Sequence, residues 1–116
     1  MEGEHSMNRL YLIGNLTADA VLAATASGMS VCTFSLAVNQ PGGKQADGSG
    51  SVTYFRCSLW GAQGEEAARM LRKGSKVFVC GEVHANVYKG RDGTARAGLE
   101  VRCREIEILS GTAQNA

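Results

Sequence analysis

Hydrophobic and polar residues alternate along most of this chain, and the clearest case is residues 52–60. Because successive side chains of a β-strand point to opposite faces, this stretch divides into two sets. One set suits a hydrophobic core and consists of Thr53, Phe55, Cys57 and Leu59. The other set places two large aromatic residues and an arginine on the opposite surface, and consists of Val52, Tyr54, Arg56, Ser58 and Trp60. The pattern therefore predicts a central strand with one core face and one aromatic, basic face.

The same alternation predicts four further strands, over residues 8–16, 30–40, 76–88 and 95–109. Gly14, inside the first of these, indicates a bulge or a close backbone approach. In the last strand the alternation reverses at Glu105, which predicts a β-bulge there. Residues 17–27 are rich in alanine and could form a helix on propensity, but we favour a continuation of the first strand to a turn at Ser27-Gly28.

One segment has the period of a helix instead. Residues 62–73 place apolar side chains among acidic residues at the start and basic residues at the end, and Gly74 follows as a stop signal. Residues 41–51 are rich in glycine but match neither phosphate-binding glycine motif, so we expect a flexible loop between two strands. Asp92-Gly93 predicts the tip of a hairpin.

Five strands with one short helix between the third and the fourth predict an all-β fold, the five-stranded Greek-key barrel called the OB-fold. A length of 116 residues fits one domain with its own core. We expect this domain to cover residues 8–109, with residues 1–7 and 110–116 as disordered extensions.

Charge is distributed unevenly along the chain. The formal net charge is only +1, but residues 69–104 contain nine Lys and Arg against three Asp and Glu. Such a segment is typical of a nucleic-acid-binding surface or of an ordinary solvated face, and the sequence leaves both open. There is no apolar run near the ~18 residues of a membrane span and no secretory signal, so we expect a cytoplasmic protein without membrane contact.

The cysteines do not indicate a metal site. Cys32, Cys57, Cys80 and Cys103 are widely spaced, and neither histidine has metal-ligand spacing to them. We expect buried free thiols, no metal and no other cofactor.

The carboxylates do not indicate an active site. They are scattered singly apart from Glu65-Glu66, which the expected helix start explains. A hydrolase or nuclease needs clustered carboxylates or a nucleophile beside a base, so we expect no enzymatic activity.

Four segments, in order along Met7 to Leu109, resemble the DNA-binding domain of bacterial single-stranded DNA-binding proteins. They are residues 8–16 (Asn-Arg-Leu-Tyr-Leu-Ile-Gly-Asn-Leu), 54–61 (Tyr-Phe-Arg-Cys-Ser-Leu-Trp-Gly), 71–75 (Leu-Arg-Lys-Gly-Ser) and 79–82 (Val-Cys-Gly-Glu). The resemblance implies sequence-independent binding of single-stranded DNA in replication, recombination and repair, and therefore a location at the nucleoid. It also implies that bases stack on aromatic side chains. Where the family often has a fourth stacking residue, a tryptophan, this chain has Gln40-Pro41-Gly42.

The resemblance and the charge distribution together give a candidate site. Tyr54, Trp60 and Tyr88 occupy three stacking positions of the family, and Arg56 matches a basic position on the same face. The DNA backbone would be held by Arg56 together with Lys73, Lys76, Lys89, Arg91 and Arg96. From the central strand alone, a different interpretation stays open, in which Tyr54 and Trp60 are half-buried beneath a loop.

The resemblance also implies partners. Self-association is expected, as a homotetramer, and Phe55 near a strand end is a candidate for the subunit contact. A dimer would favour an alternative function, that of a replication-restart accessory protein of the primosomal protein B type. The family commonly ends in an acidic tail that recruits repair and replication enzymes, whereas this chain ends at Gln114-Asn115-Ala116. We therefore expect no recruitment through such a tail, either because the sequence is shortened or because this member lacks that function.

Overall fold

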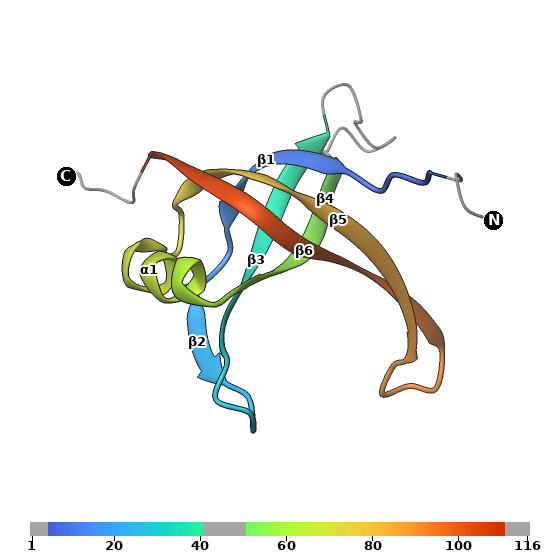
Figure 1. Cartoon of the computed structure of the whole chain (residues 1–116). Helices are drawn as coiled ribbons and strands as arrows, with labels where there is room; N and C mark the ends of the chain where they lie inside the picture. Colours follow the sequence, from blue (N-terminus) through green and yellow to red (C-terminus); the bar gives the residue numbers. More distant parts are fainter. Residues whose placement is uncertain (1–4, 41–50, 111–116) are drawn as a thin grey trace.

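A computed structural model describes residues 5–40 and 51–110 of the chain. The elements are β1 (Leu10–Leu16), β2 (Val21–Ala24), β3 (Ser30–Gln40), β4 (Ser51–Trp60), α1 (Ala62–Met70), β5 (Lys76–Lys89) and β6 (Ala95–Ser110). The strands form one sheet in the order β1-β5-β6-β4-β3-β2, and a further pairing between β1 and β3 closes it into a barrel (Figure 1). The expected all-β barrel of the OB type is confirmed. Most of the expected loop over 41–51 and of the expected terminal extensions lies outside the described residues.

The segment after β1 differs from the expected continuous strand. β1 pairs with Leu36 and Ala37 of β3, and β2 pairs with residues 30–33 of the same strand. Residues 17–20 separate the two strands: Thr17 still bonds to Ser35 of β3, but Asp19 and Ala20 bond to the segment after α1. The Ala20 N–H donates to the Leu71 carbonyl at 3.2 Å. The helix therefore lies between the fourth and fifth strands rather than the third and fourth, although it joins the two segments that the sequence predicted.

The core fills the barrel from the inward faces of the strands. On β4, Phe55, Cys57 and Leu59 keep only 8%, 0% and 2% of their surface exposed, which confirms the expected core face. Phe55 lies opposite Leu36 in the β3–β4 register, and both side chains belong to the core cluster. The expectation that Phe55 is free for a subunit contact is therefore wrong, because the barrel closes around it.

Two predicted irregularities are present. Cys80 pairs with Glu105 while Gly81 pairs with Cys103, so one extra residue of β6 forms the expected bulge and the inward phase changes there. At Gly14 a Cβ atom would lie 2.7 Å from the Ala37 carbonyl oxygen, which confirms the close backbone approach.

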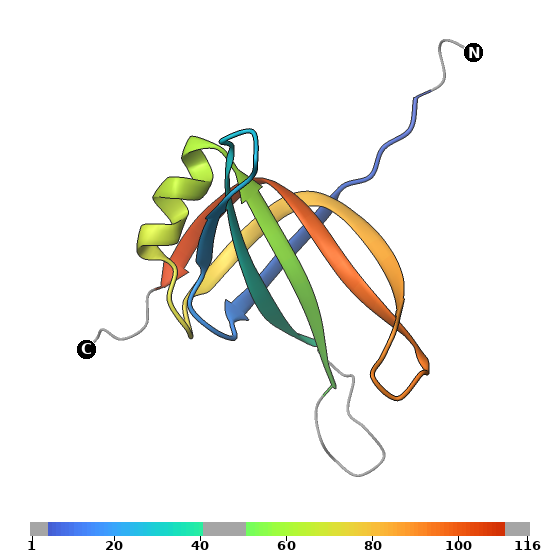
Figure 2. The same cartoon turned by 90° about the horizontal axis from the view of Figure 1, so that it is seen from below.

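Helix α1 packs against one end of the barrel, and the β5–β6 hairpin extends from the other side (Figure 2). Helix α1 ends at Met70 rather than at the expected residue 73, because Leu71 adopts an extended conformation and is completely buried. Gly64 faces the end of β4, where a Cβ atom would overlap the Leu59 carbonyl. Within the described residues, no helix is long and apolar enough to cross a membrane.

Candidate nucleic-acid interface

The outward face of β4 presents its aromatic residues to solvent. Tyr54 exposes 62% of its surface and Trp60 exposes 40%, and Arg56 is also exposed. Two of them have small neighbours on β3, with Ala37 opposite Tyr54 and Ser35 opposite Arg56, whereas Val31 lies opposite Trp60. Small neighbours leave the ring faces accessible. The interpretation that a loop half-buries both rings is therefore wrong for Tyr54, and Trp60 is only partly covered.

A hollow of about 750 Å³ lies between the start of β4 and the β5–β6 hairpin. Tyr54, Arg56 and Tyr88 all line it, although they come from different parts of the chain. Tyr88 is 54% exposed, and a Cβ atom at Gly98 would lie 3.5 Å from its Cε1, so its ring packs over a position without a side chain. The fold thus brings two predicted stacking residues and the predicted arginine around one opening.

A second hollow, of about 250 Å³, continues along β4 towards Trp60. Arg56 and Glu100 line both hollows, so the two are adjacent. Trp60 and Arg102 line the second one at its far end. We call this surface, from Tyr88 and Tyr54 through Arg56 to Trp60, the β4 track.

The positive charges of the β4 track come from two arginines. Arg56 and Arg102 are exposed, and among the described residues neither makes a hydrogen bond or an ion pair. By contrast, Arg104 donates two hydrogen bonds to Glu82, from Nε at 3.1 Å and from a terminal nitrogen at 2.7 Å. These bonds and the positive charge of Arg104 lower the pKa of Glu82. Uncommitted guanidinium groups on an open surface suit phosphate oxygens.

Sequence reasoning missed one acidic residue on this surface. Glu100 of β6 lies beside Arg56 in the parallel β4–β6 register and lines both hollows. A carboxylate there opposes phosphate binding nearby, so it limits where the backbone of a polyanion can lie.

Among the other predicted basic residues, Lys73, Lys76, Lys89 and Arg91 do not line the two hollows of the β4 track. Lys89 and Arg91 are exposed at the far end of the β5–β6 hairpin, and Arg96 pairs through its backbone with Tyr88. Lys73 donates its backbone N–H to Asp19 at 2.8 Å, and Asp19 lines a hollow of about 340 Å³ together with Arg56. Lys76 lies opposite Asn15 of β1. These positions can add long-range attraction without contacting the stacked bases.

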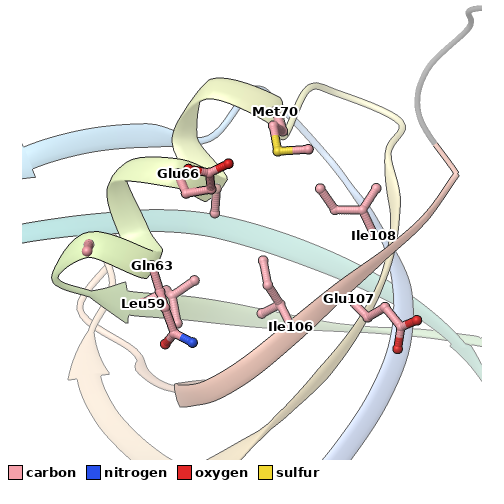
Figure 3. A pocket seen from close by; sticks show the side chains of 9 residues that line it. Leu59, Gln63, Glu66, Met70, Ile106, Glu107 and Ile108 are labelled. Atoms are coloured by element: carbon pink, nitrogen blue, oxygen red, sulfur yellow. The ribbon is translucent and has the colours of Figure 1, made fainter.

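A different kind of hollow separates α1 from the end of β6 (Figure 3). It measures about 580 Å³, and Met70 faces Ile106 and Ile108 across it. Glu66 and Glu107 also line it, and no lysine or arginine does so among the described residues. An apolar, acidic lining does not suit a nucleic acid, so this hollow is not part of the candidate interface.

The cysteines contribute to the core rather than to a reactive site. All four are free and buried. A hydrogen bond with Cys103, together with burial, raises the pKa of Cys57, and burial raises the pKa of Cys32. Protonated thiols are poor nucleophiles and poor metal ligands. Within residues 5–40 and 51–110, no group of three His, Cys, Asp or Glu residues could hold a metal ion.

Known proteins with similar sequences share one description. The model of the "Single-strand binding protein family" matches residues 7–109. A Listeria innocua protein named single-stranded DNA-binding protein 3 is 36% identical over 110 residues, which are 95% of this chain and 68% of the relative. Single-stranded DNA-binding proteins of Bacillus cereus and Treponema pallidum are 37% and 34% identical over 103 residues, or 89% of this chain.

These matches cover the whole barrel and both faces of β4. This chain spans 60% of the length of the Bacillus cereus relative and 58% of the Treponema pallidum relative. The family match nevertheless includes nearly every residue that the structure describes. The chain therefore belongs to the single-strand binding protein family.

Proposed function

We propose that this chain binds single-stranded DNA without sequence preference, through the β4 track, and that residues 8–109 form the binding domain. The observation that carries the proposal is the open hollow shared by Tyr54, Arg56 and Tyr88. Aromatic rings accept any base because every base has a flat face, and an arginine between them can hold the phosphate. The protein would act as a non-enzymatic binder that protects and organises single strands during replication, recombination and repair.

The same arrangement explains a preference for single strands. The bases of a duplex are stacked on one another, so their faces cannot reach Tyr54 or Tyr88 without unpairing. A single strand offers each face at little cost, and one stacked base contributes about 1–3 kcal/mol. No observation favours the primosomal alternative, since three stacking residues are present.

Fluorescence anisotropy with labelled oligonucleotides, single-stranded and duplex, at two salt concentrations tests this function. We expect tighter binding of the single strand and an affinity that falls steeply with salt, by about 0.7 in the log–log slope for each phosphate neutralised. Tyr88→Ala should weaken binding. Its matched control is Val87→Ala, since Val87 is the neighbouring residue, is 77% exposed and lies on the other face of β5. Equal affinity for duplex and single strand would contradict the proposal.

We further propose that the chain associates with copies of itself, as a homotetramer, through the outer face of β1 and the first half of β5. Tyr11 and Ile13 expose 65% and 52% of their surfaces, and the Tyr11 ring stacks on Phe78 with centroids 6.2 Å apart. An apolar face of this kind suits a second copy of the same face. Light scattering should give a mass above that of one chain, and Ile13→Lys should lower it. A monomeric wild-type protein would refute the association.

A further inference from the structure

We propose that a nucleotide subsite lies beyond Trp60, between the β2–β3 turn, the start of α1 and β6, where it binds one unpaired base and its phosphate. The inference rests on the proposed function and extends the bound strand past the residues that the sequence indicated. The subsite is a hollow of about 560 Å³. The residues that would act in it are Met29, Trp60, Gln63 and Arg102, all of which line the hollow.

The subsite continues the β4 track. Trp60 and Arg102 line this hollow and also the hollow that they share with Arg56. A strand that passes Arg56 and stacks a base on one side of Trp60 therefore meets the subsite next. The path uses surface that the structure already presents and needs no movement of the barrel.

Met29 gives the subsite an apolar wall that is held in place. It is 52% exposed and belongs to a turn closed by hydrogen bonds to Thr25. The Met29 N–H donates to Thr25 Oγ1 at 3.2 Å, the Thr25 N–H donates to the Met29 carbonyl at 2.9 Å, and the two hydroxyl groups of Thr25 and Ser27 are 2.9 Å apart. A polarizable thioether opposite an indole suits a flat aromatic ligand. Because the turn is ordered before binding, little entropy is lost when a base enters.

Arg102 supplies a guanidinium group that makes no direct contact with an acidic group, although its charge contributes to the lowered pKa of Glu82. Its cross-strand neighbour is Glu82, but Glu82 accepts both hydrogen bonds of Arg104. Arg102 makes no hydrogen bond or ion pair within the described part of the chain, and it is exposed at the edge of the subsite. A guanidinium group in this state can bind a phosphate without first breaking another contact.

The polar groups of the subsite also favour a nucleotide. Gln63 lies in the first turn of α1 near Leu59 (Figure 3), and it lines both this hollow and the apolar hollow between α1 and β6. An amide offers a donor and an acceptor, so it can bond the edge of any base. Among the described residues that line the subsite none is acidic, whereas the hollows on either side contain Glu100 or Glu66.

The test compares two arginine variants that remove the same charge. Arg102→Gln should weaken the binding of an oligonucleotide that is long enough to cover the β4 track by about tenfold. It should also reduce the log–log salt slope by about 0.7, as expected for one lost phosphate contact. Arg69→Gln is the matched control, because Arg69 is exposed on α1, is bonded to Glu66 and lines neither the β4 track nor the subsite, so this substitution should leave affinity within about twofold. Met29→Ala should weaken binding by about fivefold or more.

A photo-crosslinking measurement locates the strand independently. An oligonucleotide carrying 5-iodouracil should crosslink to the peptide that contains Met29, and mass spectrometry should identify it. If the wild-type protein fails to bind single strands, the proposed function itself fails. If it binds and depends on Tyr54, but Arg102→Gln and Met29→Ala both behave like Arg69→Gln, the subsite alone is wrong.

Discussion

The two faces of β4 differ in environment although their residues alternate along one strand. Phe55, Cys57 and Leu59 point into the barrel and are almost fully buried, whereas Tyr54 and Trp60 point outward and are 62% and 40% exposed. The inward set contributes to folding and the outward set is available to a ligand. Neighbouring residues of β4 therefore serve different roles. Substitutions on the inward face should lower the free energy of unfolding, whereas substitutions on the outward face should lower the affinity for DNA.

The largest effect should come from the inward face. Leu59→Ala removes a side chain that is 2% exposed and leaves a cavity in the core. We expect a loss of about 2–5 kcal/mol in the free energy of unfolding, measured by urea denaturation. Trp60→Ala, one residue further, should cost much less stability. If Trp60→Ala destabilised the domain as strongly as Leu59→Ala, the separation of the two faces would be wrong.

Substitutions on the outward face of β4 should lower the affinity for single-stranded DNA rather than the stability of the fold. Tyr54→Ala removes one stacking ring and should cost about 1–3 kcal/mol of affinity for single-stranded DNA, measured by anisotropy. Its melting temperature should stay close to that of the wild-type protein. Val52→Ala is the control, because Val52 lies on the same face at 39% exposure but does not line the hollow of Tyr54. Equal affinities of the two variants would contradict the role of Tyr54.

Stability should also fall at alkaline pH, because of the inward thiols. Folding raises the pKa of Cys57 and of Cys32 above the usual value of 9.0. Below that value the thiols are protonated in both states. Above it only the unfolded state releases protons, so the free energy of unfolding should decrease by up to about 1.4 kcal/mol per pH unit for each thiol. Cys57→Ala should reduce the dependence of the free energy of unfolding on pH, measured by urea titrations above pH 9.0. The same dependence in Cys57→Ala and in the wild-type protein would contradict this role of Cys57.

The smallest effect should come from the exposed ion pair. Arg104 lowers the pKa of Glu82, so the pair stabilises the fold above the usual pKa of a glutamate, and this contribution disappears as the pH falls through the lowered value. Arg104→Gln should return the pKa of Glu82 towards its ordinary value in an NMR titration. Only a slight change in stability is expected, since exposed pairs contribute little. If the pKa of Glu82 in the wild-type protein already had its ordinary value, the bond between Arg104 and Glu82 would not persist in solution.

The features that the sequence predicted depend on nearby residues. The alternation from Val52 to Trp60 is local, and so is the phase change near Glu105, which the register of β6 confirms. The break after β1 could not be predicted, because its cause is a bond from Ala20 to Leu71, far along the chain. The same holds for Phe55, since its burial depends on how the barrel closes around it.

In the candidate site, too, the sequence predicted what depends on nearby residues and missed what depends on strand pairing. The outward direction of Arg102 was readable from its own strand. Its place in one hollow with Trp60 was not, because the parallel pairing of β4 with β6 brings Arg102 opposite Ser58. Glu100 was missed for this reason as well. Local patterns therefore identified the residues of one strand, and tertiary pairing supplied the rest of the surface.

The most direct test of the central claim uses Trp60, the only tryptophan in the sequence. If bases stack along the outward face of β4, the fluorescence of Trp60 should be quenched as single-stranded DNA is added. The quenching should reach its maximum at the same DNA concentration as the anisotropy of the labelled strand. Duplex DNA at the same concentrations should leave the emission unchanged. Saturated binding of a single strand with no change in Trp60 emission would contradict the account.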